Sequence, residues 1–152
     1  MITCRRKPLS LLWWAPAMAW AGLIFCLSTP TFGPHWSGRL LALWLRLAHW
    51  RLSWQTFGLL NVVLRKLAHV TEYGILALLL YAGADSGEQS GWQPRRAALC
   101  IAAAFAYSLS DELHQRFAPG RHASIFDCGI DSFGASLAML APYLKSKSWR
   151  GG

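Results

Sequence analysis

Charged residues are scarce in this sequence, and acidic residues are the scarcest of them. Only 14% of the 152 residues carry a charged side chain, whereas an ordinary soluble domain carries roughly a quarter. Apolar residues make up 54% of the chain, which includes nine tryptophans. This composition argues against an ordinary soluble protein, and the length predicts one domain over residues 1–152.

Motifs for several common kinds of site are missing as well. The four cysteines, Cys4, Cys26, Cys100 and Cys128, form no CxxC pair. We therefore expect small buried apolar side chains rather than a disulfide framework or a zinc site. No nucleic-acid-binding signature accompanies the net charge of +8, which suits anionic lipid headgroups instead. The sequence predicts no nucleic-acid partner.

The chain does contain four long apolar blocks, separated by short basic stretches. A helix needs about 20 apolar residues to cross roughly 30 Å of hydrocarbon. The first block has no charge between Lys7 and Arg39. It is longer than the core of a signal peptide and no clear cleavage site follows it, so we expect an uncleaved anchor. The predicted fold is an all-α integral membrane bundle of four helices, with spans at about 9–28, 66–84, 97–116 and 127–144.

A basic segment rich in Trp and Leu lies between the first two predicted spans. Within residues 38–54, Arg39, Arg46 and Arg51 interrupt a series of Leu and Trp residues. Such a pattern is typical of an amphipathic helix that lies in the membrane interface. The alternative is a short extra helix packed on the bundle.

The distribution of basic residues predicts the orientation in the membrane. With the N-terminus inside, eight Lys and Arg residues face the cytoplasm and seven face the other side. The cytoplasmic set stands directly at helix ends, where the positive-inside rule applies best. The other set lies on the interfacial segment or beside acidic residues. We therefore predict that both termini are cytoplasmic.

Five of the seven acidic residues belong to one predicted site. The second block begins with polar residues, the third ends with them and the fourth begins with them. In an up-and-down bundle these three ends lie on the same side. Asp85 and Glu88 alone fall outside this acidic cluster, whose members are Glu72, Asp111, Glu112, Asp127 and Asp131.

Helical spacing supports this convergence on two of the blocks. Lys66, His69 and Glu72 stand three residues apart, so they occupy one arc of the second block. Asp111 and Gln115 stand four residues apart and share a face of the third block. Each of these faces is predicted to point toward the same polar region.

The fourth block places its acids on a face that can approach another helix closely. Asp127 and Asp131 are four residues apart, and the same stripe continues through Gly134 and Ala138. Small residues at this spacing let helices pack tightly. The loop before the block carries Arg121, which we expect to lie over the acids.

Ionisable groups within a membrane usually mark a function, because burying their charge is costly. The alternative is structural: Lys66, His69 and Arg121 could pair with the acids in an ion-pair lattice that locks short helices together. The sequence leaves both interpretations open.

Three motifs in this order resemble the VanZ-like family. They are KLAHVTEYGIL at 66–76, SDELHQ at 110–115 and PGRHAS at 119–124 followed by Asp127 and Asp131. The resemblance covers the chain from about Trp13 to Ala141. It implies a small multi-pass protein of the bacterial inner membrane whose biochemical activity is poorly defined. The named member is associated with low-level teicoplanin resistance, which implies cell-envelope or lipid-linked chemistry.

The first functional hypothesis is a membrane-embedded enzyme that acts on a lipid-linked or amphipathic cell-envelope substrate. Crowded carboxylates and a histidine can do general acid–base work, and the candidate catalytic residues are His69, Glu72, Asp111 and Glu112. A divalent cation such as Mg²⁺ or Mn²⁺ would suit this donor set, although the spacing does not diagnose a metal site. Lys66 and Arg121 could clamp an anionic headgroup. The complete substrate-binding set is Lys66, Gln115, Arg121, Asp127 and Asp131.

Two other classes of function remain open. The same cluster could bind or transport a lipophilic ligand, including as an accessory protein in glycopeptide resistance, and four helices would then call for a homo-oligomer. The chain could instead be a structural subunit whose polar face docks a membrane partner.

Overall fold

The computed structural model describes residues 11–84, 91–117 and 124–148, and every element within these ranges is helical. The all-α prediction is therefore confirmed for this part of the chain. The elements comprise two short 3₁₀-helices and six α-helices. In chain order they are η1 (Leu11–Trp13), α1 (Ala15–Ser28), η2 (Pro30–Phe32), α2 (Pro34–Leu47), α3 (Trp54–Gly83), α4 (Pro94–Arg116), α5 (Ile125–Ala138) and α6 (Leu140–Ser148).

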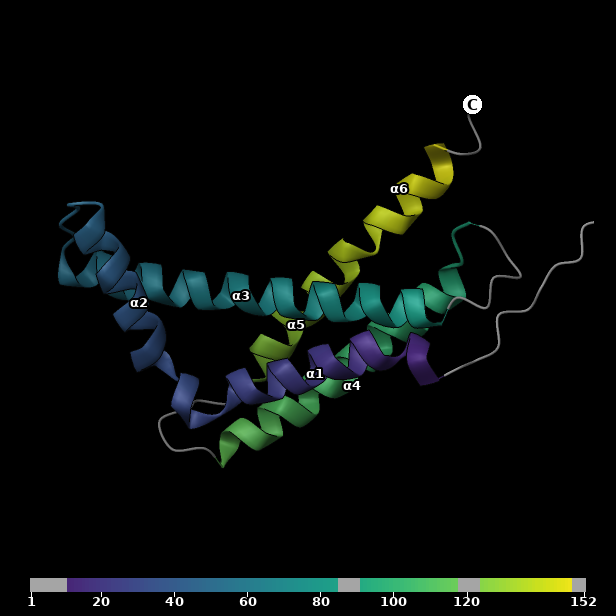
Figure 1. The fold of residues 1–152 in the computed structure, drawn as a ribbon, viewed down its shortest axis with the longest axis horizontal. Coiled ribbons are helices and arrows are strands. Elements are labelled where there is room, and N and C mark those ends of the chain that lie inside the picture. The colour runs from purple at the N-terminus through teal and green to yellow at the C-terminus, as the bar shows by residue number, and fades with distance from the viewer. Residues whose placement is uncertain (1–10, 85–90, 118–123, 149–152) are drawn as a thin grey trace, which may run out of the picture.

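Helix α3 is the central element of the fold. Its 30 residues give a length of about 45 Å at 1.5 Å per residue, and it packs against α1, α2, α4 and α5. In Figure 1, α1 and α4 lie side by side along one flank of α3, and α2 lies against its N-terminal part. Two side chains fix α1 in this position: Trp20 Nε1 donates to the Glu72 carbonyl at 2.9 Å, and Tyr107 Oη donates to the Ala21 carbonyl at 2.7 Å.

Helix α3 begins at Trp54 rather than near residue 66. The Ser53 side chain accepts a hydrogen bond from the Thr56 backbone N–H, at 3.1 Å, and so caps the helix. Mostly apolar residues then continue the helix to the charged pair at 65 and 66. The helix is therefore longer than the predicted span of 66–84, because a charged pair inside a helix does not end it. As a result, the polar residues lie at mid-length of α3 instead of at its end.

The amphipathic helix begins and ends earlier than the predicted range of 38–54. Helix α2 covers Pro34–Leu47, with proline at its first position, where the missing N–H and fixed φ are tolerated. His49 adopts φ 55°, a left-handed conformation that ends helices. Leu41 and Leu45 are buried, so one face of α2 packs on the bundle while Trp and Leu side chains elsewhere on the helix are exposed.

The fourth predicted span is broken into two helices, α5 and α6, at Met139. The physical reason is Pro142, which has no backbone N–H and whose ring clashes with the carbonyl four residues earlier, that of Ala138. Helix α5 therefore ends at Ala138, and the Tyr143 N–H bonds to the Met139 carbonyl at 3.3 Å in the next helix.

Taken singly, none of the described helices is both long and apolar enough to cross a membrane. Helix α1 and the segment 30–47 satisfy the length and composition requirements together, as a pair bent by 72°. The four predicted spans thus remain predictions.

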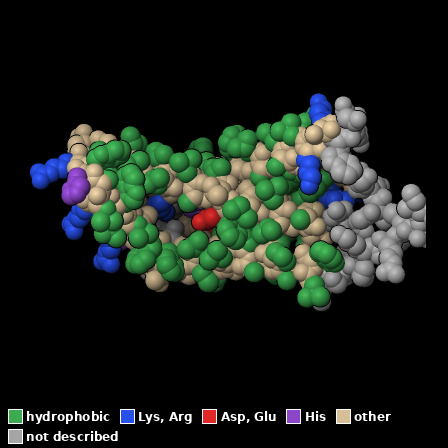
Figure 2. All heavy atoms as spheres, turned by 45° about the horizontal axis from the view of Figure 1, so that its top comes forward, with side chains coloured by type: hydrophobic (Ala, Val, Ile, Leu, Met, Phe, Trp, Pro, Cys, Tyr) green, Lys and Arg blue, Asp and Glu red, His purple; other side chains and the backbone are tan. Residues whose placement is uncertain are grey.

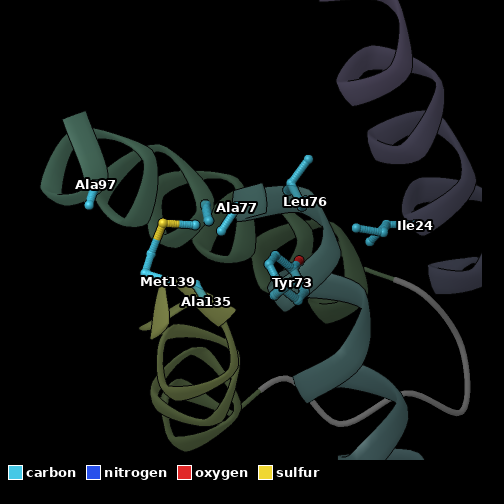
Figure 3. Close-up of a cluster of buried hydrophobic side chains, with 8 residues drawn as sticks. Ile24, Tyr73, Leu76, Ala77, Ala97, Ala135 and Met139 are labelled. Carbon is cyan, nitrogen blue, oxygen red and sulfur yellow. The ribbon is translucent and has the colours of Figure 1, made fainter. Parts of the chain in front are cut away.

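Small side chains dominate the core between α3, α4 and α5. Figure 3 shows Tyr73, Leu76 and Ala77 of α3 facing side chains from the neighbouring helices. The other buried members of this cluster are Ile24, Ala97, Ala104, Ala135 and Met139. The alanines let the helix backbones come close together, and Tyr73 fills the remaining space beside the polar residues.

The closest approach of two helices is the crossing of α3 and α5. A Cβ built on Gly134 would lie 2.8 Å from Val70 Cα and would also collide with the Val70 carbonyl oxygen. A Cβ on Gly74 would lie 3.2 Å from the Gly134 carbonyl oxygen and 3.4 Å from Ala138 Cβ. The predicted stripe of small residues on the fourth block is confirmed as a tight packing face.

We predict that Gly134→Ala destabilises the fold by about 1–3 kcal/mol, the usual range for forcing an extra methyl group into a packed interface. Thermal unfolding of the purified protein in detergent measures the effect. Gly129→Ala is the matched control, because it lies on the same helix and an added Cβ there meets nothing within 4 Å. Equal stability of the two variants would show that α3 and α5 are not in such close contact.

Candidate functional site

The C-terminal part of α4 carries the first of two buried polar networks. Asp111 is 4% exposed, and its Oδ2 accepts hydrogen bonds from Ser28 Oγ at 2.8 Å and from Gln115 Nε2 at 2.9 Å. Asp111 and Gln115 share one face of α4, in agreement with their spacing, and Ser28 is the last residue of α1. This network therefore joins the C-terminal parts of α1 and α4.

The second network joins α3, α4 and α5. Asp131 is 2% exposed, and its Oδ2 accepts a hydrogen bond from the fully buried Ser108 Oγ. Its other oxygen, Oδ1, lies 3.4 Å from His69 Nδ1. The His69 ring stacks on that of Tyr73, with 6.5 Å between centroids and 6° between the planes. Each of the three helices thus contributes a polar side chain to one buried contact.

Four buried polar atoms of these networks have no hydrogen-bond partner within the described ranges. They are His69 Nδ1, Tyr73 Oη, Asp111 Oδ1 and Asp131 Oδ1. The contact of His69 with Asp131 is close enough for an ion pair when the histidine is protonated, but it is not aligned as a hydrogen bond. The large majority of buried side-chain polar atoms in proteins have a hydrogen-bond partner, so this concentration distinguishes the region from the rest of the described core.

Glu112 contacts the N-terminus of α5 and is not part of the two networks. Its Oε2 accepts a hydrogen bond from the Ser124 backbone N–H at 2.7 Å. Ser124 is the N-cap of α5, and its Oγ accepts from the Phe126 N–H at 3.3 Å. These bonds fix the point at which the chain enters α5, and the proximity of a carboxylate to a helix N-terminus is favourable.

Lys66 and Asp127 form an ion pair at the edge of the same region. Lys66 Nζ lies 2.8 Å from Asp127 Oδ1, and the two side chains are 48% and 30% exposed. Asp127 lies one turn before Asp131 on α5, just as Lys66 lies one turn before His69 on α3. Two contacts between an acidic and a basic side chain therefore join α3 and α5, one turn apart. The Lys66–Asp127 contact is exposed, and the His69–Asp131 contact is buried.

A polar pocket of about 300 Å³ opens beside these networks. Its apolar wall comes from the end of α1, from η2 and from α2, and includes Phe32 and Trp36. Its ionisable side is formed by Arg65, His69 and Glu72, all from α3. Ser28 and Ser37 line it as well. Because Ser28 also bonds Asp111, its hydroxyl connects the pocket to the first buried network.

The structure thus divides the predicted site residues among several places. His69 and Glu72 line the polar pocket. Asp111 and Gln115 do not line the pocket but connect to it through Ser28, and Asp131 connects to it through His69. The remaining described members, Lys66, Asp127 and Glu112, form the exposed ion pair and the start of α5. Arg121 lies outside the described residues.

Four polar residues of the site are missing from the sequence prediction: Ser28, Ser37, Arg65 and Ser108. The pattern of α4 could have revealed Ser108, because the buried residues of that helix follow a strict helical stripe. They are Ala97, Cys100, Ala104, Ser108, Asp111, Glu112 and Gln115. A serine on a stripe that otherwise contains alanines and site acids is expected to face the same neighbours.

The prediction left the presence of a metal open. Within residues 11–84, 91–117 and 124–148, no group of three or more His, Cys, Asp or Glu side chains is arranged to hold a metal ion. Four carboxylates of the described part instead accept hydrogen bonds from serine, glutamine or backbone donors or face a basic side chain: Asp111, Glu112, Asp127 and Asp131. The three cysteines in these ranges, Cys26, Cys100 and Cys128, are free.

Comparison with known proteins identifies the family. No curated protein and no solved structure matches the chain at a significant level. The family model described as VanZ/LLP1 matches residues 13–146, which include α1 to α5 and every site residue discussed above. The chain therefore belongs to the VanZ/LLP1 family.

Proposed function

We propose that this protein is a multi-pass protein of the bacterial inner membrane that acts, at one membrane face, on a lipid-linked or amphipathic cell-envelope substrate. The observation that carries the proposal is the lining of the polar pocket, which has an aromatic and aliphatic wall opposite an ionisable one. A small-molecule site typically combines a mostly apolar lining with a few polar groups that orient the ligand. An amphipathic molecule satisfies both walls, with its chain along Phe32 and Trp36 and its headgroup at Arg65, His69 and Glu72.

The exposed surface supports the membrane location. Large apolar side chains are exposed on all six α-helices, and Figure 2 shows them over most of one face, with Lys and Arg at its two ends. A soluble monomer rarely exposes contiguous apolar patches larger than a few hundred Å². In lipid this surface faces hydrocarbon, and we expect both termini to be cytoplasmic, because the basic residues nearest the ends of the predicted spans lie on that side.

The headgroup side of the pocket suits an anionic group such as a phosphate. Arg65 replaces Lys66 as the headgroup ligand in this proposal, because Lys66 is paired with Asp127 and Arg65 lines the pocket. A guanidinium can bind a phosphate through two parallel hydrogen bonds.

The acid–base chemistry falls to His69 and Glu72, which line the pocket beside Arg65. A histidine and a carboxylate at a bound headgroup can exchange protons with it. Asp131 orients His69 from behind, and Asp111 holds the Ser28 hydroxyl through a hydrogen bond of 2.8 Å. Each buried acid therefore positions a group that faces the pocket.

A photoreactive amphipathic probe tests the proposal. Farnesyl monophosphate that carries a diazirine should label wild-type protein in detergent within residues 27–40 and 65–72, the segments that line the pocket. Ala68 lines the pocket and is exposed, so Ala68→Phe should fill it and remove most of the labelling. Ala102→Phe is the matched control, because Ala102 is exposed on α4 and does not line the pocket.

Undiminished labelling of Ala68→Phe, or labelling spread evenly over the apolar surface, would contradict a specific site. Excess unlabelled farnesyl monophosphate should compete with the probe, whereas farnesol, which has the same chain and no charge, should compete much less. Equal competition by the two would show that the ionisable wall does not bind the headgroup.

A further inference from the structure

A second opening, the apolar groove, lies between α4 and the α5–α6 break. It has a volume of about 360 Å³, and its sides are formed chiefly by Ala97, Ala98 and Ile101 of α4 and by Met139 and Leu140 at the break. None of its lining residues belongs to the polar pocket. The groove exists because α4 presents alanines there and because Pro142 interrupts the facing helix.

Three aromatic rings stand at the mouth of the groove. Trp92 stacks on Tyr81, with 5.8 Å between centroids and 24° between planes, and meets Tyr143 edge-on at 5.6 Å. Trp92 and Tyr143 line the groove directly. Tyr and Trp are enriched at the level of lipid headgroups, where one side of the ring is apolar and the other is wet. This ring stack therefore marks the groove mouth as an interface position.

A cation lies over each end of the ring stack. The Arg96 guanidinium carbon is 5.0 Å from the centroid of the Tyr81 ring, and Lys147 Nζ is 5.2 Å from that of Tyr143. Both contacts fall within the range of cation–π attraction, which holds the two charges on either side of Trp92. Two cations held beside an apolar groove are complementary to a molecule with one negative headgroup and a long chain.

The other charged residues near the apolar groove also favour an anionic ligand. Arg95 and Lys145 are exposed close by in sequence, and all five acids of the acidic cluster belong to the other site. Asp85 and Glu88 precede the groove in the chain, outside the described residues. Even if both lay at the mouth, the four basic residues would outnumber them by two.

We propose that the apolar groove binds one anionic phospholipid, with an acyl chain along Ala98, Ile101 and Leu140 and its phosphate at Lys147, beside Tyr143 of the groove lining. A zwitterionic phospholipid fits less well, because its own cation meets the basic residues. Basic pockets between helices on the cytoplasmic side typically recognise anionic headgroups. This site rests only on the membrane location proposed above and is separate from the polar pocket.

Lipid binding to the purified protein tests the proposal. In detergent, phosphatidylglycerol should remain bound in native mass spectra as one molecule per chain and should raise the thermal midpoint. Phosphatidylcholine with the same acyl chains should do so much less. Lys147→Gln should weaken phosphatidylglycerol retention about fivefold, as expected for the loss of one cation near an anionic lipid. Arg39→Gln, on α2 away from the groove, is the control for general attraction to a basic protein.

A second pair of variants tests the acyl-chain position. Ala98→Phe should fill the groove and abolish the gain in stability from phosphatidylglycerol, while Ala103→Phe, exposed on α4 outside the groove, should keep it. Equal binding of the two lipids, or unchanged binding by both Lys147→Gln and Ala98→Phe, would overturn the proposal. Labelling of the polar pocket by farnesyl monophosphate should survive in Ala98→Phe, so a failure here is distinguishable from a failure of the proposed function.

Discussion

Asp111→Asn should leave the protein at least as stable as the wild type while abolishing its effect on envelope lipids. Asp111 is buried, and no Lys, Arg or His of the described ranges lies within ion-pair distance of its carboxylate. The asparagine oxygen can still accept from Ser28 and Gln115, so both hydrogen bonds survive. The substitution removes a buried charge and keeps both hydrogen bonds, which offsets the cost of placing the new amide N–H groups where Oδ1 has no partner within the described ranges.

Asp111→Leu provides the contrast. It leaves the Ser28 hydroxyl buried without its acceptor, and the Gln115 amide keeps only its longer bond to Ser28 Oγ, at 3.4 Å. A buried donor without an acceptor costs about 1–3 kcal/mol. The thermal midpoint in detergent should fall by several degrees for Asp111→Leu and should not fall for Asp111→Asn. Both variants lack the charge, and only Asp111→Asn keeps an acceptor oxygen. The difference between their thermal midpoints therefore measures the contribution of the hydrogen-bond acceptor.

The functional readout works even when the reaction is unidentified. Mass spectrometry of host membranes should show a change in the profile of lipid-linked envelope precursors on expression of the wild type, and none on expression of Asp111→Asn. Western blotting of the membrane fraction controls for protein level. If Asp111→Asn is folded and still shifts the lipid profile, Asp111 is part of the scaffold and the charge has no role in the activity.

The sequence predicts much of this fold because its main signals are local. Helical spacing alone places Asp111 with Gln115 and identifies the stripe through Gly134 that packs on α3. Hydropathy predicts the end of α1 at Ser28 and both ends of α4 to within three residues, although α1 begins six residues later than predicted. Helix α3 is longer than its predicted span, since an apolar helix can continue through charged residues once a cap such as Ser53 has started it.

The site itself is predicted less completely, because it depends on contacts between distant segments. Ser28 meets Asp111 across 83 positions of the chain, and nothing in the local pattern of α1 distinguishes this serine from an ordinary helix end. Which of Arg65 and Lys66 is the proposed headgroup ligand likewise depends on the position of Asp127, because Asp127 pairs with Lys66. A helical face can be inferred from spacing, whereas the neighbour of that face is set by how the helices cross.

Asp131→Leu should destabilise the protein far more than Asp127→Leu. The two aspartates lie one turn apart on α5, and each faces a basic side chain one turn apart on α3. Asp131 is 2% exposed and lies 3.4 Å from His69, while the Lys66 and Asp127 side chains are 48% and 30% exposed. Loss of Asp131 leaves the buried Ser108 hydroxyl without its acceptor, at about 1–3 kcal/mol. When His69 is protonated it also breaks a buried ion pair, at about 3–5 kcal/mol, whereas an exposed pair contributes about 0.2–1 kcal/mol.

The same substitution at the two positions therefore compares a buried aspartate with a more exposed one on the same helix. Thermal unfolding in detergent measures both variants. His69→Leu in the Asp131→Leu background should recover part of the loss, because the remaining polar partner is then removed as well. The Ser108 hydroxyl still lacks its acceptor in the double variant, so recovery should be incomplete. Equal losses for Asp127→Leu and Asp131→Leu, with no recovery in the double variant, would mean that the buried contact adds nothing to stability beyond what the exposed pair adds.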